Sequence, residues 1–190
     1  MNKNIAIFAS GEGTNAQTII DYFKSSSQVK IALVVSNKST ANVLNRAKNN
    51  NIPTLVIDRN AFYESNTVVE QLKNANIDLI VLAGFLWMIP ENLIKAFPNK
   101  IVNIHPALLP KFGGKGMFGM NVHKAVIEAK EKESGISIHF VNEHYDEGKI
   151  ISQYKCEVLE KDSAEDLAKR IHQLEYEFFP KAIENLLQVK

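Results

Sequence analysis

Short runs of apolar residues recur along the first half of the chain and alternate with amphipathic segments. Four of these runs cover residues 5–9, 31–35, 54–57 and 79–83. Because they lack alternation with polar residues, both faces of the strands that they predict should be covered, as in a parallel sheet. The segments between them have the length and periodicity of helices, and this βαβ rhythm is typical of an open, doubly wound sheet.

Capping signals indicate where several helices begin. Thr14 and Gln17 form a candidate capping box for the first helix, and Pro90 is suited to the first turn of another. Near the C-terminus, Ser163 and Asp166 form a second capping pair. The helix that follows should pack through an apolar stripe of Leu167, Ile171, Leu174 and Phe178.

The second half of the chain predicts a different strand arrangement. A fifth strand is expected at 101–104, followed by a loop rich in glycine and proline and a helix at about 121–130. Two apolar strands, 136–141 and 150–154, are then joined by a connection too short for a helical crossover, so they should pair antiparallel. We predict a single α/β, Rossmann-like domain: a mostly parallel twisted sheet with helices on both faces and an antiparallel strand pair near the C-terminus.

Composition excludes several classes of protein. The 190 residues carry 22 Lys and Arg against 21 Asp and Glu, so neither a nucleic acid nor an anionic membrane is an expected partner. The single cysteine, Cys156, excludes an intramolecular disulfide and a site with several thiolates, and we expect no metal. Without a signal peptide or a long apolar span, the sequence predicts a cytoplasmic protein.

A glycine loop lies between the first strand and the first helix. Residues 11–16 match the pattern G-x-G-x-x-A, and the helix N-terminus behind them offers backbone N–H groups to a phosphate. The second strand ends in Ser36-Asn37-Lys38, without the carboxylate that a dinucleotide site needs, which weakens a nicotinamide interpretation. The alternative is a turn required only for close packing of strand and helix.

Asn103 and His105 lie two residues apart at the end of the fifth strand, so their side chains should point to the same side. An amide N–H can stabilise an oxyanion and an imidazole can transfer a proton, which together suit acyl transfer between amines. The alternative is a histidine that only satisfies a backbone carbonyl.

The polar connection 142–148 brings a further carboxylate, Asp146. If Asp146 approaches His105, its charge should raise the pKa of the histidine and make it a proton donor. An ordinary solvated hairpin would have a similar sequence. His139 alternates with apolar neighbours and could face inward, and Cys156 is most simply a small core residue.

Taken together, the motifs at 10–15, 82–85, 103–110, 138–141 and 146–151 resemble the folate-dependent formyltransferases. The resemblance extends from about Ile5 to Pro180. It implies one domain over residues 1–190, with a phosphate-binding half at about 1–100 and a folate and catalytic half at about 101–190. It also implies direct transfer of a formyl group from 10-formyltetrahydrofolate to the amine of glycinamide ribonucleotide, in purine biosynthesis.

The resemblance assigns roles to individual residues. Asn103 would bind the formyl oxygen as it becomes an oxyanion, His105 would act as general acid, and Asp146 would hold His105. The ribonucleotide would be bound by Gly13, Thr14 and Asn15 at its phosphate and by Glu175 and His172. The folate would be lined by Leu86, Trp87, Met88, Ile89, Asn103, Asn142, Glu143, Tyr145 and Asp146. Both substrates are small molecules, no metal is implied, and the chain would be a monomer or a homodimer.

Three departures from the family pattern affect the folate side. Trp87 stands where some members carry arginine, and the basic contact that some relatives make within 62–76 should be absent or supplied from elsewhere. The glycine-rich segment 113–120 looks like a longer version of the loop that follows the 103–110 motif in the family, and its glycines suit a mobile lid.

Other interpretations remain. Methionyl-tRNA formyltransferase shares the residues Asn103, His105 and Asp146, but its additional RNA-binding domain is not expected in a chain of this length and charge. Formyltetrahydrofolate hydrolase uses the same residues with water as acceptor, and its additional N-terminal domain is likewise not expected here. Outside the family, a nicotinamide-dependent oxidoreductase or a nucleotide-binding module would use the loop at Gly11 and Gly13.

Overall fold

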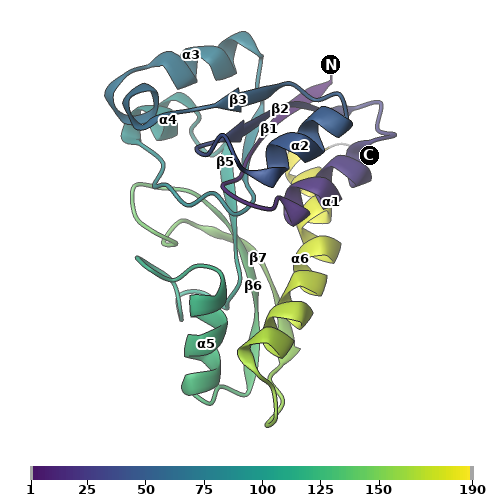
Figure 1. Ribbon diagram of the computed structural model, residues 1–190, viewed down its shortest axis with the longest axis vertical. Helices are drawn as coiled ribbons and strands as arrows, with labels where there is room; N and C mark the ends of the chain where they lie inside the picture. The colour runs from purple at the N-terminus through teal and green to yellow at the C-terminus, as the bar shows by residue number, and fades with distance from the viewer. Residues whose placement is uncertain (1, 189–190) are drawn as a thin grey trace. The chain divides into compact units, whose positions relative to one another are not determined.

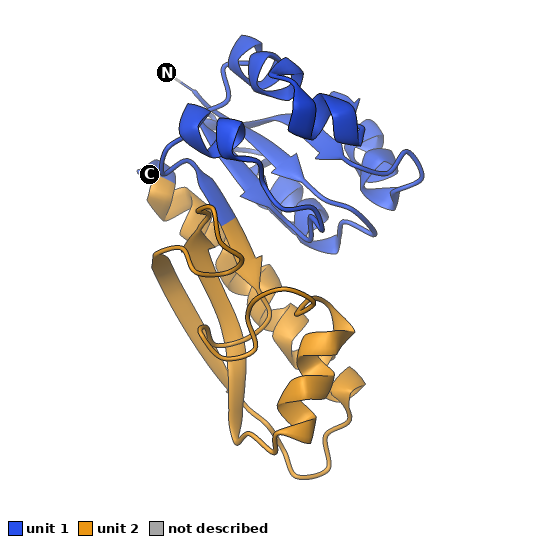
Figure 2. Cartoon of the chain, turned by 90° about the vertical axis from the view of Figure 1, so that its left-hand side faces the viewer, with its two compact units in different colours: residues 1–102, 187–190 blue, residues 103–186 orange. Residues whose placement is uncertain are grey.

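The computed structural model describes residues 2–188, and the chain forms two compact units (Figure 2). The first unit comprises the chain up to Val102 together with its end from Leu187, and the second is Asn103–Leu186. Strand β5 (Ile101–His105) begins in the first unit and ends in the second. The expectation from the sequence that the chain is one domain with two halves stays a prediction.

The first unit contains a parallel sheet with the strand order β3-β2-β1-β4, continued by the start of β5. Its strands are β1 (Lys3–Phe8), β2 (Val29–Ser36), β3 (Thr54–Val56) and β4 (Leu79–Leu82) (Figure 1). Residues 5–8 of β1 are completely buried, as their uninterrupted apolar run predicts. Its helices are α1 (Thr14–Phe23), α2 (Asn42–Asn49), the π-helix η1 (Asn60–Glu64), α3 (Thr67–Asn74) and α4 (Glu91–Ala96).

The start of α1 differs from the prediction of a Thr14 capping box. The N-cap is Gly13, in the left-handed conformation at φ 70°, and no side chain caps the helix. The side-chain amide of Gln17 instead donates to Asp21. The turn is set by close packing, because a Cβ on Gly13 would lie 2.5 Å from the Val43 Cγ2 atom of α2. The first turn of α1 therefore begins without a capping side chain.

The second unit holds the end of β5 with β6 (Glu133–Phe140) and β7 (Ile150–Glu157), in the order β5-β6-β7. Strands β6 and β7 are antiparallel, with Ser137 opposite Gln153, which confirms the predicted pair. The helices of this unit are α5 (Met120–Glu128) and α6 (Ala164–Leu187), whose last residue is assigned to the first unit.

Helix α6 begins as the sequence predicts and buries a slightly different face. The Ser163 hydroxyl donates to Asp166 at 2.6 Å and accepts the Asp166 backbone N–H at 3.1 Å, which confirms the capping pair. Leu174 is only half-buried. The buried face runs instead through Leu167, Ile171, Glu175 and Phe179.

The predicted stripe is therefore wrong in its second half, where Phe178 leaves the core and stacks on Tyr154 with ring centroids 3.8 Å apart. A strict step of four keeps residues on the buried side of this helix. Within residues 2–188, no helix is long and apolar enough to cross a membrane.

Gly135 of β6 provides a test of the β6–β7 pairing. A Cβ there would lie 2.0 Å from the Tyr154 carbonyl oxygen, which is backbone and cannot yield easily. We expect Gly135→Ala to lower the free energy of unfolding by at least about 2 kcal/mol, measured by urea denaturation.

Gly11→Ala is the matched control, since its Cβ would meet no atom within 4 Å. It should change the unfolding free energy by less than about 1 kcal/mol. Equal unfolding midpoints for the two variants would show that the described pairing is wrong.

Candidate functional site

Asn103, His105 and Asp146, which the sequence singles out, come together in the second unit. Strand β5 carries the first two, and the loop between β6 and β7 carries Asp146, whose backbone has φ 56°. His105 Nδ1 lies 3.5 Å from Asp146 Oδ2. Asn103 is linked to this pair through His139 of β6, because its side-chain nitrogen lies 3.1 Å from His139 Nε2.

From the sequence, His139 is predicted only to face inward. The contacts that it makes in the site are not evident from the sequence. Its Nδ1 lies 2.9 Å from the Phe140 carbonyl oxygen. Because the nitrogen of the Asn103 side chain can only donate, Nε2 is the acceptor in their contact. The same Nε2 lies 3.6 Å from Asp146 Oδ1. One hydrogen of the Asn103 amide is thus engaged by the protein, and the second is available to another acceptor.

His105 is almost fully buried and faces acceptors at both ring nitrogens. Its Nε2–H donates to the Phe112 carbonyl at 2.7 Å, while Nδ1 faces Asp146. The Asp146 carboxylate also accepts the Gly114 backbone N–H at 2.9 Å. Asp146 thus lies where its charge favours the imidazolium form of His105.

The net pKa of His105 nevertheless lies below its ordinary value. Burial is the largest cause, and it outweighs the opposing effects of the Asp146 charge and the Phe112 carbonyl. The contribution of Asp146 has the direction expected from the sequence, but the expected net rise in pKa is wrong. Burial raises the pKa of Asp146, but the contacts with His139, His105 and Gly114 together outweigh it and lower that pKa.

The chain after His105 is held by a buried network that sequence reasoning did not identify. The Ser137 hydroxyl donates to the Ala107 carbonyl at 2.7 Å and accepts the Leu109 N–H at 2.9 Å. The side-chain nitrogen of Gln153 lies 2.8 Å from the Ser137 hydroxyl and donates to the Leu109 carbonyl at 3.0 Å. Strands β6 and β7 thereby fix the loop that leads to Phe112.

The predicted phosphate loop lies in the first unit. Gly13, Thr14 and Asn15 form the start of α1. At the end of β2, the Ser36 hydroxyl accepts the Lys38 N–H, and the chain there carries no carboxylate to bind a ribose. The phosphate interpretation of this loop stays a prediction.

The residues expected to line a folate pocket are divided between the units. Residues 86–89 belong to the first unit, where Ser10 Oγ accepts the Leu86 N–H at 2.9 Å. Residues 142–146 belong to the second, where the Asn142 side chain accepts the His144 N–H and Tyr145 is 43% exposed. Glu143 is also exposed.

Arg59 brings a positive charge close to Trp87, the position at which the sequence resemblance led us to expect a departure from the family. Its guanidinium carbon lies 5.5 Å from the ring centroid of Trp87 and 5.5 Å from that of Tyr63, whose hydroxyl donates to the Met88 carbonyl. The segment 62–76 also contains one basic residue, Lys73 in the last turn of α3. Positive charge is thus present in this region, although at other positions.

His172 and Glu175 lie on α6 in the second unit. Glu175 is 6% exposed, and the ring of His172 packs against Tyr176 and, edge-on, against His123 at 6.5 Å between centroids. His123 of α5 was not singled out by the sequence. Burial, with the nearby charges of His172 and His105, lowers the pKa of His123 to about 4. Among residues 2–188, no three His, Cys, Asp or Glu side chains are grouped to hold a metal.

The chain matches the model of the formyl transferase family over residues 3–183. It is 41% identical to the chloroplastic phosphoribosylglycinamide formyltransferase of Vigna unguiculata, over 98% of this chain and 61% of that protein. It is 40% identical to the phosphoribosylglycinamide formyltransferase of Haemophilus influenzae, over 95% of this chain and 85% of that protein. The chain spans less than two thirds of the two plant relatives, 61% and 64%.

Solved structures share the fold. The glycinamide ribonucleotide transformylase 1 of Symbiobacterium toebii superposes with a TM-score of 0.89 at 35% identity, covering 98% of this chain and 88% of that one. The phosphoribosylglycinamide formyltransferase of Bacillus halodurans gives 0.88 at 38% identity, covering 97% and 95%. The predicted α/β fold class is confirmed.

The low pKa of His123 predicts a pH-dependent stability. Because the folded pKa of about 4 lies below the ordinary 6.5, the unfolded chain binds more protons in between. The contribution of His123 to the free energy of unfolding is thus fully present above about pH 6.5. This contribution falls as the pH drops towards 4. The free energy of unfolding should fall between pH 7 and pH 5, and replacing His123 by Gln should make this fall smaller by about 1–2 kcal/mol, measured by urea unfolding.

His144→Gln is the control, because it replaces an exposed histidine on the loop after β6. The remaining slope belongs in part to His105 and His172, whose pKa values are also lowered by burial. An identical slope in His123→Gln and the unmodified protein would contradict the assignment.

Proposed function

Because the chain belongs to the formyl transferase family, we propose that it transfers the formyl group of 10-formyltetrahydrofolate to the amine of glycinamide ribonucleotide, in purine biosynthesis. Relatives named phosphoribosylglycinamide formyltransferase match it over 95–98% of its length. The observation that carries the proposal is the cluster of an amide, a buried imidazole and a carboxylate at Asn103, His105 and Asp146. Proton transfer and oxyanion stabilisation in an acyl transfer need these groups.

In the proposed reaction, the amine of the ribonucleotide attacks the formyl carbon and a new C–N bond forms. The formyl oxygen becomes an oxyanion, which accepts the amide hydrogen of Asn103 that His139 does not engage. When this intermediate collapses, the bond to N10 of the folate breaks. N10 gains one proton and the attacking amine loses one, so the reaction releases tetrahydrofolate and the formamide without net proton uptake.

His105 is the proposed proton donor to the leaving nitrogen, and Asp146 is the group that sustains its charged form. Burial lowers the pKa of His105 and so makes the imidazolium a stronger acid. The charge of Asp146 acts in the opposite direction and limits the fall in pKa. Since Nε2–H donates to the Phe112 carbonyl, a substrate reaches that proton only after this carbonyl moves. The following segment 113–120 holds three glycines at positive φ and is the proposed lid.

Substrate contacts follow from the same proposal. Gly13, Thr14 and Asn15 bind the ribonucleotide phosphate at the start of α1. Glu175 and His172 bind the rest of the ribonucleotide. The residues that line the folate pocket are Leu86, Trp87, Met88, Ile89, Asn142, Glu143, Tyr145 and Asp146. A cytoplasmic location and a monomeric or homodimeric state stay predictions, and two of the plant relatives are named as chloroplastic.

The function is tested by incubating the protein with 10-formyltetrahydrofolate and glycinamide ribonucleotide while following the folate absorbance. We expect turnover that requires the ribonucleotide and yields its formamide. Release of formate in buffer alone, with no dependence on the ribonucleotide, would identify a hydrolase. No folate turnover together with binding of a nicotinamide dinucleotide would contradict the family assignment of the activity.

Two variants test the roles within the cluster. His105→Ala and Asp146→Asn should each lower kcat by about 100-fold or more and change the Kd for the ribonucleotide little, because both groups act mainly in the transition state. His144→Ala, which removes an exposed imidazole from the same loop as Asp146, should keep normal turnover. Near-normal kcat in either cluster variant would exclude the proposed acid chemistry.

A further inference from the structure

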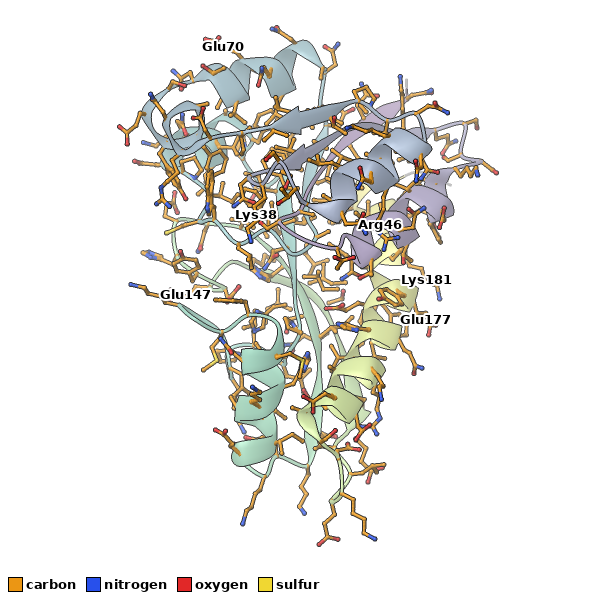
Figure 3. All side chains as sticks on the ribbon, in the orientation of Figure 1. Lys38, Arg46, Glu70, Glu147, Glu177 and Lys181 are labelled. Atoms are coloured by element: carbon orange, nitrogen blue, oxygen red, sulfur yellow. The ribbon has the colours of Figure 1, made fainter. Side chains whose placement is uncertain are left out.

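In the proposed function, the loop that precedes α1 binds a phosphate although it carries no positive charge of its own. Residues 10–15 include no lysine or arginine, and their one ionisable side chain is the carboxylate of Glu12. A phosphate dianion would be repelled by this carboxylate unless the neighbouring structure compensates. Helix α2, which lies beside α1, provides the contacts that do so (Figure 3).

Two donors on α2 hold the carbonyls of the loop. The Val43 backbone N–H donates to the Gly11 carbonyl at 3.1 Å, and the Arg46 Nε–H donates to the Glu12 carbonyl at 2.7 Å. In a planar trans peptide the N–H points opposite to the preceding carbonyl. These two bonds therefore turn the N–H groups of Glu12 and Gly13 away from α2.

Those N–H groups remain available to a ligand. In the described part of the chain, the backbone N–H groups of Glu12, Gly13 and Thr14 donate to no protein acceptor. Gly13 is left-handed at φ 70°, and successive N–H groups in such a turn converge on one point and bind anions. The loop is thus organised as an anion cradle by contacts made on its other side.

The acidic side chain of the loop is also held by α2. The Asn42 side-chain amide donates to Glu12 Oε2 at 3.0 Å, so the carboxylate lies with the helix that carries Arg46. Arg46 is half-buried, and within residues 2–188 its two terminal amino groups have no hydrogen-bond partner. Its charge is therefore not neutralised by an ion pair within that part of the chain.

We propose that Arg46 is a positioning residue of the phosphate cradle. Through Nε it fixes the Glu12 carbonyl and so aims the Gly13 N–H, and through its charge it offsets Glu12. This inference rests on the proposed function only in naming the anion, which is the phosphate of the ribonucleotide.

The test separates the two contributions of Arg46 by its substituents. Arg46→Met keeps the aliphatic stem and removes both donor and charge. Arg46→Gln restores an N–H donor at the position of Nε without charge. Lys48→Met removes a charge from the same last turn of α2, and in the described structure Lys48 makes no side-chain hydrogen bond or ion pair with the loop.

Each protein is titrated with inorganic phosphate while the backbone amide signal of Gly13 is followed by NMR, and KM and kcat are measured with the ribonucleotide and the folate. Arg46→Met should weaken phosphate binding and raise the ribonucleotide KM by about tenfold or more, with kcat and the folate KM changed less than about threefold. Arg46→Gln should recover part of both losses, and Lys48→Met should resemble the unmodified protein.

Three results would overturn the role of Arg46. These are unchanged phosphate affinity in Arg46→Met, equal losses in Arg46→Met and Lys48→Met, or a fall in kcat and a rise in both KM values to the same degree. The phosphate titration needs no turnover, so it stands apart from the proposed function. A protein without transferase activity whose Gly13 signal responds to phosphate only when Arg46 is present would refute the function and retain this inference.

Discussion

One carboxylate, that of Asp146, connects the groups of the proposed active site. It lies 3.5 Å from His105 and 3.6 Å from His139, two imidazoles that are both buried. The Gly114 backbone N–H holds it in place. Burial lowers the pKa of His105, and the charge of Asp146 opposes this effect without reversing it. The direction of the Asn103 amide depends on His139 in turn, so a single ionised group connects the oxyanion donor with the proton donor.

Backbone groups form part of the proposed sites in both units. In the second unit, the Phe112 carbonyl and the Gly114 N–H face His105 and Asp146 directly, and the chain leading to them is held by Ser137. In the first unit, Arg46 holds the Glu12 carbonyl and leaves the N–H groups free. Backbone groups cannot be lost by mutation, but their direction is set by side chains that do not touch the substrate. Such side chains are the ones that sequence motifs do not identify.

The sequence predicted the strands well because short, uninterrupted apolar runs between polar segments are typical of buried strands. It also found Asn103 and His105, since alternation within a strand fixes which side chains share a face. It failed where tertiary packing decides. The helix cap at Gly13 follows from contact with Val43, and the role of His139 depends on pairing between strands. The net pKa of His105 depends on burial, which no spacing reveals.

The most direct test of this account is the titration of His105, followed by imidazole NMR signals in the unmodified protein and in Asp146→Asn. The substitution keeps the burial of His105 and removes the charge that opposes it. We expect the pKa of His105 to fall further below its ordinary value in the variant. An unchanged or higher pKa would show that Asp146 does not sustain the imidazolium, and the proposed proton donor would lose its physical basis.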